Sequence, residues 1–303
     1  MSHKLYFRNA YVFLVGLIIA PVLFFKYLFD TLAARQLINV FVYFFSHSYY
    51  FAKLYKLPNI IYPKGINDRV QKSKLLENEV DFVNLSDKLY LKDHVLKKLG
   101  KPLFPKTVKI FSSKKDFENY CVEQKVVLKT NNDSGGIRIL QKGHTLSKDD
   151  FDLFMDAGRS NFGIITGEWA YRCIYPKIFI EEYLDFEDGD VPDDYKFYCR
   201  NGSVRFCHYL CDRFDNPSEQ VIDINGDDIG VPLYPLFAYG SKFTKPENWD
   251  QMLNVASKLS EGLDFVRVDL YSDRKDVYVG ELTFWPQAGT YRGPGQLYYE
   301  LYL

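Results

Sequence analysis

The sequence has few of the patterns that mark common metal and nucleic-acid sites. Its five cysteines are odd in number and include no C-x-x-C pair, so free thiols are expected rather than a disulfide framework or structural zinc. The five histidines show no H-x-x-x-H spacing, which disfavours a zinc hydrolase. The 38 basic and 39 acidic residues nearly balance. Without a basic excess to neutralise phosphates, we expect no nucleic-acid partner.

Common phosphate-binding fingerprints are also missing. Neither the P-loop pattern G-x-x-x-x-G-K-[ST] nor the dinucleotide pattern G-x-G-x-x-G occurs. Hydrophobic residues make up 47% of the chain and charged residues 25%, which is ordinary for a folded protein. The 303 residues are enough for one large domain or two modest lobes.

The N-terminus differs from the rest of the chain. Ala10–Phe25 is an unbroken apolar or weakly polar run with basic residues on both sides, and a second apolar stretch follows at Leu37–Phe45. A full helical span needs about 20 apolar residues, and Pro21 should kink a helix. Three interpretations stay open: a secretory signal, a buried helical hairpin, and a shallow membrane anchor.

Elsewhere the pattern predicts an α+β protein with antiparallel hairpins. A capped helix is expected from Ser86–Asp87 to Leu99, with Leu91, Val95, Leu96 and Leu99 on one face. A second helix is expected from Ser113 to about Cys121. Asn201–Gly202 between two apolar runs predicts a tight hairpin. Further strands are expected at Phe265–Tyr271 and Val277–Phe284.

Two groups of residues could bind a nucleotide. Lys129 ends an apolar strand that runs into Ser134–Gly135–Gly136, whose backbone N–H groups can approach a phosphate closely. The segment FIEEYL then places Glu181 and Glu182 beside apolar residues. Taken alone, the first pattern is a weak signal, and an ordinary hairpin with a polar tip is its structural alternative. Solvated acids at a strand end are the better explanation of the second pattern when it is taken alone.

A third group could bind a divalent cation. Arg267 and Asp269 are two apart on one predicted strand, and Glu281 lies on the next. Paired carboxylates on adjacent strands can hold Mg²⁺ when phosphates complete its shell. A cross-strand salt bridge is the structural alternative.

The order of these groups resembles the ATP-grasp superfamily, and more closely its TupA-like branch, named for teichuronopeptide synthesis. The resemblance covers about residues 58–303. It rests on Pro63–Lys64, Asp87–Lys88 and the segments VVLKTNNDSGG, FIEEYL, DYKFYCRNG, FVRVDLY and VGELTFWPQAG. It implies an α+β ATP-grasp fold, in which two α+β lobes sandwich ATP, after an N-terminal apolar helical segment. The predicted division is 1–57, 58–180 for the flap lobe and 181–303 for the C-terminal lobe.

The resemblance also implies roles for individual residues. Lys88 and Lys129 match the lysines that hold ATP phosphates, and Ser134, Gly135 and Gly136 match the flap over them. Glu181 matches the adenine-binding acid, with Glu182 and Leu184 as hinge contacts. Arg267 matches the arginine near the transferred phosphate, and Lys196 faces phosphate or acceptor. Asp269 and Glu281 match the Mg²⁺ ligands; Thr283 stands where the family usually has Asn.

The reaction implied by the resemblance is ATP-dependent amide formation through an acylphosphate. The expected substrates are an acidic sugar or an amino acid, with a lipid-linked glycan as a further candidate, in cell-surface polysaccharide (capsule) synthesis. ATP use predicts a cytoplasmic location, peripheral on or anchored to the inner face of the membrane through residues 10–45. Two alternatives stay open. One is an ATP-grasp-type kinase; the other is a metal-dependent glycosyltransferase, suggested by the D-x-D of Asp188–Gly189–Asp190.

Overall fold

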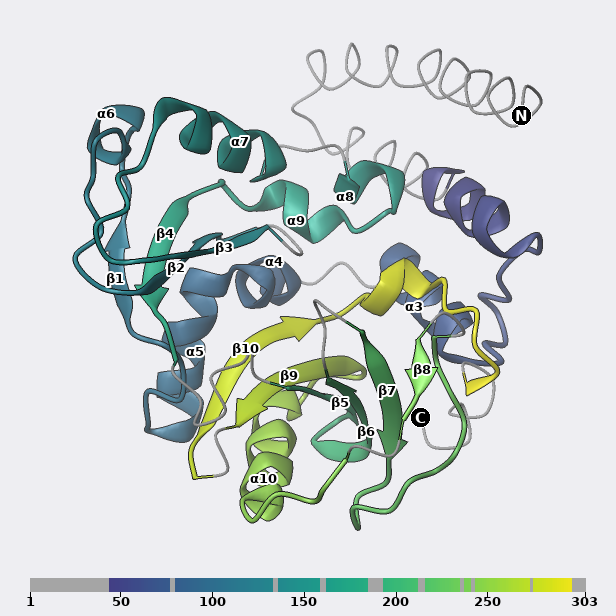
Figure 1. Ribbon diagram of the computed structural model, residues 1–303. Coiled ribbons are helices and arrows are strands. Elements are labelled where there is room, and N and C mark those ends of the chain that lie inside the picture. The colour runs from purple at the N-terminus through teal and green to yellow at the C-terminus, as the bar shows by residue number, and fades with distance from the viewer. Residues whose placement is uncertain are drawn as a thin grey trace.

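The computed structural model describes residues 44–76, 80–132, 136–158, 162–184, 193–211, 216–234, 237–240, 243–272 and 275–295. They form two α+β lobes, each built on its own sheet (Figure 1), as the predicted α+β class requires. The apolar run Ala10–Phe25 lies outside the described residues, so its helix stays a prediction. Within the described ranges, no helix is long and apolar enough to cross a membrane.

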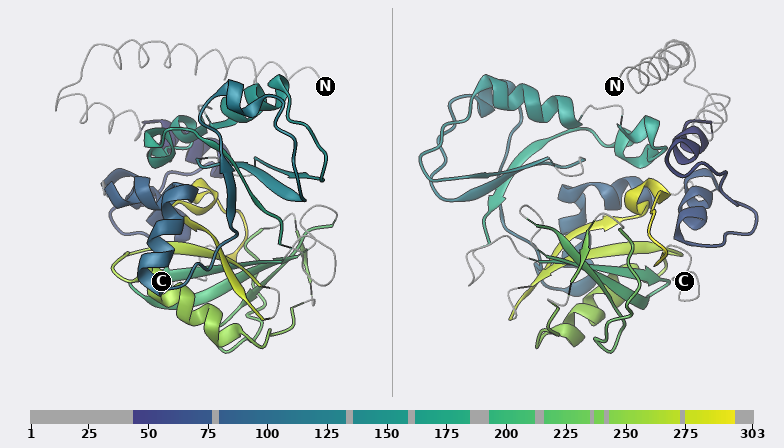
Figure 2. Two further views of the ribbon diagram at one scale, coloured as in Figure 1. Left: turned by 90° about the vertical axis from the view of Figure 1, so that its left-hand side faces the viewer. Right: turned by 45° about the vertical axis from the view of Figure 1, so that its right-hand side comes forward.

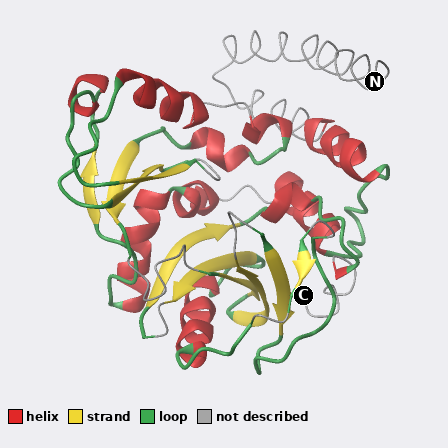
Figure 3. Cartoon of the chain, viewed as in Figure 1, coloured by secondary structure: helices red, strands yellow, loops and turns green. Residues whose placement is uncertain are grey.

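The smaller lobe is an antiparallel sheet in the order β1–β4–β2–β3. Its strands are β1 (Thr107–Ile110), β2 (Val126–Thr130), β3 (Ile137–Leu140) and β4 (Ile178–Glu182). Helices α6 (Lys114–Phe117) and α7 (Lys148–Gly158) cover one face (Figure 3). Val126 and Leu128 are buried in the core on that face. Because side chains alternate along a strand, Lys129 lies on the opposite face, toward the larger lobe.

The larger lobe is a six-stranded sheet in the order β10–β9–β5–β6–β7–β8. All its pairs are antiparallel except β7 with β8. The strands are β5 (Asp194–Arg200), β6 (Ser203–Cys211), β7 (Ser218–Ile222), β8 (Ala238–Tyr239), β9 (Val266–Ser272) and β10 (Val277–Thr283). The predicted hairpin joins β5 to β6, where Asn201 and Gly202 both have positive φ. Helix α10 (Trp249–Ser260) packs against β5, β6 and β9 of this sheet and lies below them in Figure 1.

Helices α3 (Ile66–Leu76), α4 (Val80–Ser86) and α5 (Lys88–Leu99) add their buried side chains to the core of the larger lobe. Figure 2 shows α4 and α5 between the two sheets. The division into domains at residues 57 and 180 stays a prediction. The packing groups residues 66–99 and Ala170 of α9 with the C-terminal sheet, and groups residues 111–155 with residues 178–180.

Helix α5 begins and ends where the sequence predicts. The side chain of Asp87 accepts hydrogen bonds from the N–H groups of Leu89 and Tyr90, and Gly100 caps the other end in the left-handed conformation. One part of the predicted apolar face is wrong, because Leu96 is 46% exposed while Val95 is buried. Helix α6 is also shorter than predicted and ends at Phe117, where the backbone of Glu118 becomes extended.

Two short helices, α8 (Phe162–Ile165) and α9 (Trp169–Cys173), connect α7 to β4. A 3₁₀ turn, η1 (Pro286–Gly289), follows β10 and packs on α3. Within it, Gln287 and Ala288 adopt positive φ, a conformation that non-glycine residues rarely hold without support. The Ala288 carbonyl accepts hydrogen bonds from Gln71 (2.9 Å) and Lys74 (2.8 Å) of α3. Helix α3 therefore stabilises the strained turn.

Candidate nucleotide and metal site

The pairing of β9 with β10 brings the predicted metal-site residues together. Glu281 pairs with Asp269 and Thr283 with Arg267, so the four side chains share one face of the sheet. The register shifts between Val279 and Glu281, which makes Gly280 the extra residue of a β-bulge. The opposite face carries the apolar residues packed on α10. Strand pairing thus creates an acidic and basic cluster that no single segment contains.

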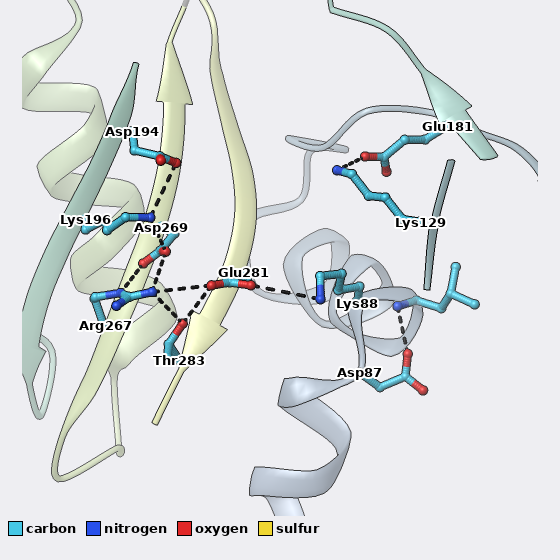
Figure 4. A network of polar contacts seen from close by, with 11 residues as sticks. Asp87, Lys88, Lys129, Glu181, Asp194, Lys196, Arg267, Asp269, Glu281 and Thr283 are labelled. Atoms are coloured by element: carbon cyan, nitrogen blue, oxygen red, sulfur yellow. Dashed lines mark hydrogen bonds and ion pairs between the residues drawn. The ribbon is translucent and has the colours of Figure 1, made fainter. Parts of the chain in front are cut away.

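One guanidinium nitrogen of Arg267 contacts three oxygen-bearing side chains (Figure 4). Its Nη2 lies 2.8 Å from Oδ2 of Asp269, 3.3 Å from Oε1 of Glu281 and 3.1 Å from Oγ1 of Thr283. Nε donates a second bond to Asp269, at 2.6 Å. The oxygens of Asp269, Glu281 and Thr283 therefore converge on one point.

Lys196 joins this cluster from β5, the strand beside β9. Its Nζ lies 2.8 Å from Oδ2 of Asp269 and 3.4 Å from Oδ1 of Asp194. Asp269 is thus held by two cations, and only 2% of its side chain is exposed. Burial raises the pKa of the Asp269 carboxyl, but the charges of Arg267 and Lys196 outweigh it and hold the pKa below the usual range. Asp269 is ionised at neutral pH.

The side chains of Asp269, Glu281 and Thr283 are of the chemical type that binds a magnesium ion. Mg²⁺ prefers oxygen ligands and takes only one or two protein carboxylates when phosphates complete its shell. Asp269, Glu281 and Thr283 offer two carboxylates and one hydroxyl that already converge on one nitrogen. Among the described residues there is no group of three or more His, Cys, Asp and Glu that could hold a metal ion by itself. A metal at this cluster would therefore need further ligands, which the oxygens of ATP and water can supply.

The second predicted group meets at the face of the smaller lobe that points to α5. Glu181 of β4 forms ion pairs with Lys129 of β2 and with Lys92 of α5, the latter at 2.9 Å. Lys92 also donates to the carbonyl of Pro105 (2.7 Å) and to Oγ1 of Thr107 (2.9 Å). Only 4% of the Glu181 side chain is exposed. Its carboxylate is therefore a buried junction between the two lobes.

Electrostatics keep this carboxylate charged. Burial raises the pKa of Glu181, but Lys129 and Lys92 outweigh the effect, and the net pKa is lowered. Burial likewise lowers the pKa of Lys92, and the attraction of Glu181 opposes that shift.

A cavity lies beside this junction, between β4, α5 and the strands β9 and β10. The ammonium groups of Lys88, Lys92 and Lys129 and the carboxylate of Glu181 provide its charged lining. The remaining walls are mainly apolar or aromatic, from Leu91, Val95, Phe104, Pro105, Phe179, Tyr271, Val279 and Gly280. Apolar walls beside cationic groups suit a ligand that has both an apolar part and an anionic part.

Lys88 lies where the cavity meets the cluster of Arg267, Asp269, Glu281 and Thr283. Its Nζ is 4.0 Å from Oε2 of Glu281, and its backbone N–H donates to the carbonyl of Asn131 (3.0 Å). Asn131 also donates to Asp87, the cap of α5 (2.9 Å). The start of the glycine-rich turn is thus tied to the N-terminus of α5. That end of a helix carries partial positive charge and favours anions.

The remaining predicted site residues either lie outside the described residues or do not line the cavity. Ser134 and Gly135 lie outside the described residues, and Gly136 immediately precedes β3. Glu182 is engaged away from the cavity: its N–H donates to Lys106 O and its carboxylate accepts from Lys106 N–H, both at 2.9 Å. Leu184 is half-buried just after β4. The D-x-D of residues 188–190 also lies outside the described residues.

Sequence reasoning missed several residues of this site. Lys92 follows Lys88 by four positions, a spacing that puts both on one helical face, so a local signal was present. Phe104 and Tyr271 carried no such signal, because their place in the cavity depends on packing between the lobes.

A buried pair near the cluster was missed as well. Lys74 of α3 and Glu168, which precedes α9, are 3% and 5% exposed. Lys74 also donates to the carbonyl of Thr166 (2.7 Å). Burial lowers the pKa of Lys74 to about 8, against the attraction of Glu168. Burial raises the pKa of Glu168, which also interacts electrostatically with Arg267 and Glu281.

Comparison with known protein families matches residues 68–297 to the family described as TupA-like ATPgrasp. A search of curated proteins found no match. Among solved structures, this chain is similar to the ATP-grasp ligase PsnB complexed with a minimal precursor, at 16% identity and a TM-score of 0.35, covering 68% of this chain and 54% of PsnB.

The D-alanine–D-alanine ligase from Bacillus anthracis complexed with ATP shares 16% identity, with a TM-score of 0.35 and coverage of 66% of this chain and 55% of the ligase. The macrocyclase MdnC from Microcystis aeruginosa MRC, bound to precursor peptide MdnA, shares 13%, with a TM-score of 0.32 and coverage of 70% and 61%. The chain spans little more than half the length of the first two proteins.

Proposed function

The chain belongs to the TupA-like ATP-grasp family, and from this premise we propose that it is an ATP-dependent, ADP-forming carboxylate–amine ligase. One observation carries the proposal: Asp269, Glu281 and Thr283 converge on Arg267, and Lys88 links that cluster to the cavity beside Glu181. A site for charged phosphates thus adjoins a site with apolar walls.

In the proposed complex, the adenine ring occupies the cavity. The ionised Glu181 accepts a hydrogen bond from the adenine amino group, while Phe179 and Val279 contact the ring. Lys88 and Lys129 neutralise phosphate charge. Asp269, Glu281 and Thr283 would hold Mg²⁺, which, when bound, neutralises charge on the phosphates of ATP. Both predicted cofactors, ATP and Mg²⁺, therefore have residues of suitable chemistry.

The proposed reaction begins with a substrate carboxylate. One of its oxygens bonds to the γ-phosphorus as the bond from that phosphorus to the bridging oxygen of ADP breaks. An amine nitrogen then attacks the acyl carbon of the acylphosphate, phosphate leaves, and the amine gives up a proton to it. Arg267 and Lys196 place positive charge where the transferred phosphoryl group develops negative charge. A carboxylate is already ionised at neutral pH and requires no general base for the first step.

We extend the proposal to the substrate class and location that the family resemblance implies. The carboxylate and amine would come from an acidic sugar, an amino acid or a lipid-linked glycan in cell-surface polysaccharide synthesis. The enzyme would work on the cytoplasmic face of the membrane, where ATP is available, with the apolar residues 10–45 as its contact. Lys88, Lys129, Lys196 and Arg267 supply positive charge at the proposed site, which suits anionic substrates.

Hydroxylamine provides the test. The purified chain is incubated with Mg-ATP, hydroxylamine and a panel of acidic sugars and amino acids. A ligase should form a hydroxamate and an equal amount of ADP with at least one carboxylate, and Glu281→Gln should form neither. A stable phosphosugar without hydroxamate would make the protein a kinase. Turnover of a sugar nucleotide in place of ATP would make it a glycosyltransferase.

A further inference from the structure

The first helix that the structure describes, residues 44–54, exposes aromatic side chains on one face. Phe44 and Phe51 are 50% and 51% exposed and stand seven residues apart, so they share a helical face. Tyr55 comes directly after the helix, is 82% exposed, and donates its N–H to the carbonyl of Phe51 (2.8 Å). The opposite side is buried on the protein through Phe45, Ser46 and Tyr50.

The exposed apolar surface continues beyond this helix. Leu57, Ile61 and Tyr62 are 70%, 73% and 76% exposed. Six of the sixteen large apolar side chains exposed in the described chain therefore fall within residues 44–62. Scattered exposed apolar residues are ordinary, but a concentration of this kind marks an interaction surface. We call residues 44–64 the aromatic–basic segment.

The charges of this segment have one sign. Residues 31–67 contain no Asp or Glu. Lys53, Lys56 and Lys64 are exposed among the aromatic side chains. A partner that matches this surface must therefore offer apolar contact and negative charge together.

Internal hydrogen bonds hold the segment in a defined shape. The carboxylate of Asp68, at the start of α3, accepts bonds from the Tyr50 hydroxyl and from the N–H groups of Asn59 and Lys64, each at 3.1 Å. Arg292 donates to the carbonyl of Lys53 at 3.2 Å. The exposed side chains therefore project from a backbone that these hydrogen bonds hold in place.

The segment also connects directly to the larger lobe. It leads into α3, whose Asn67 exchanges two 2.8 Å hydrogen bonds with the backbone of Tyr291. Gln71 and Lys74 of the same helix hold η1, the turn that follows the metal-site strand β10. Figure 1 shows the helix of residues 44–54 in purple, beside α3 and α8 and away from the sheet of the smaller lobe.

We propose that the aromatic–basic segment binds the surface of a membrane that contains anionic lipid. Aromatic side chains favour the membrane–water interface, where apolar rings and polar groups are both accommodated. Each Lys near an anionic surface adds attraction, and interfacial binding grows with the apolar area buried. The contact would orient the end of the site at η1 toward the membrane. This inference rests on the membrane location given under the proposed function and adds a second contact to it, but it is argued from exposure and charge and not from the ligase chemistry.

Backbone hydrogen exchange of the full-length protein tests the proposal. It is measured without vesicles, with phosphatidylcholine vesicles, and with vesicles that also contain phosphatidylglycerol. We expect slower exchange within residues 44–62 only with the anionic vesicles. Unchanged exchange in this segment would overturn the proposal. Equal protection by both kinds of vesicle would also overturn it, as would full protection without vesicles, because another part of the chain would then cover the surface.

Matched variants separate the contribution of the lysines to vesicle binding from that of the exposed aromatic side chains. Lys53→Gln with Lys56→Gln should weaken binding to anionic vesicles about 30-fold, or about fivefold for each basic residue. Phe51→Ser with Tyr55→Ser should weaken it about tenfold or more. The control is Leu153→Ser with Tyr175→Ser, which changes side chains of similar exposure, 57% and 75%, on the other lobe. Equal losses in the control and in either variant would overturn the proposal.

Discussion

The ammonium group of Lys92 lies 2.9 Å from Oε2 of Glu181, while Lys129 pairs with the other oxygen of the same carboxylate. Lys92 belongs to α5, which packs in the core of the larger lobe, whereas Lys129 and Glu181 belong to the sheet of the smaller lobe. The ion pair therefore crosses between the lobes at the cavity. It holds Glu181 ionised and turned toward the position proposed for adenine.

Lys92→Met is expected to weaken ATP binding at least tenfold and to destabilise the protein by about 1–3 kcal/mol, because a buried carboxylate loses one of its two cations. Since the folded-state pKa of Glu181 lies below its ordinary 4.5, its ionisation stabilises the wild type above that pH. The stability gap to the variant should shrink as the pH falls below about 4.5. Nucleotide titration and urea unfolding at several pH values measure both effects.

Lys97→Met is the control for this prediction, since Lys97 is exposed on the same helix. Its ATP affinity and stability should stay near those of the wild type. If Lys92→Met bound ATP as tightly as the control, the junction would have no role in nucleotide binding.

Glu281→Gln is expected to abolish Mg-ATP turnover while changing stability by less than about 1 kcal/mol. The substitution removes a negative charge at nearly constant volume, and the amide oxygen can still accept the bond from Arg267. Turnover at saturating Mg²⁺ and thermal unfolding are the measurements. Glu261→Gln, an exposed acid paired with Lys98, is the control. Wild-type turnover in Glu281→Gln would remove this residue from the metal site.

Gly280→Ala tests the close contact between the β-bulge residue and the ring of Tyr271. A Cβ at this position would lie 2.7 Å from the ring of Tyr271, which also lines the cavity. We expect a loss of about 1–3 kcal/mol in unfolding free energy and weaker nucleotide binding, because the ring must move. The double variant Gly280→Ala, Tyr271→Ala should recover part of the stability. A fully stable single variant with normal binding would show that the ring moves without cost.

Truncation defines where the N-terminal region joins the fold. Removing residues 1–43 should leave nucleotide binding intact. Removing residues 1–50 should destabilise the protein, because it deletes the buried Phe45 and Tyr50 and the hydrogen bond from Ser46 to Gln71. Nucleotide titration and thermal unfolding of the two truncated proteins measure nucleotide affinity and stability. Equal stability of the two would mean that the helix of residues 44–54 adds nothing to the core.

Local sequence patterns predicted much of the secondary structure. Asp87 and Gly100 mark both ends of α5, and Asn201–Gly202 marks the hairpin, because caps and tight turns depend on a few neighbouring residues. The predicted strands around Arg267 and Glu281 are also present. The order of the motifs along the chain was sufficient for the family resemblance, which the match over residues 68–297 bears out.

The tertiary structure decided how these elements meet. Register and the bulge at Gly280 turn Asp269 and Glu281 toward the same arginine, and packing between the lobes brings Lys92 to Glu181. Lys74 comes near Glu168 because it reaches from α3 to the carbonyl of Thr166, far along the chain. Contacts between distant segments depend on burial and on the exact alignment of strands, which local propensity does not encode. The sequence alone determined which chemical groups are available, and the fold determined which of them share a site.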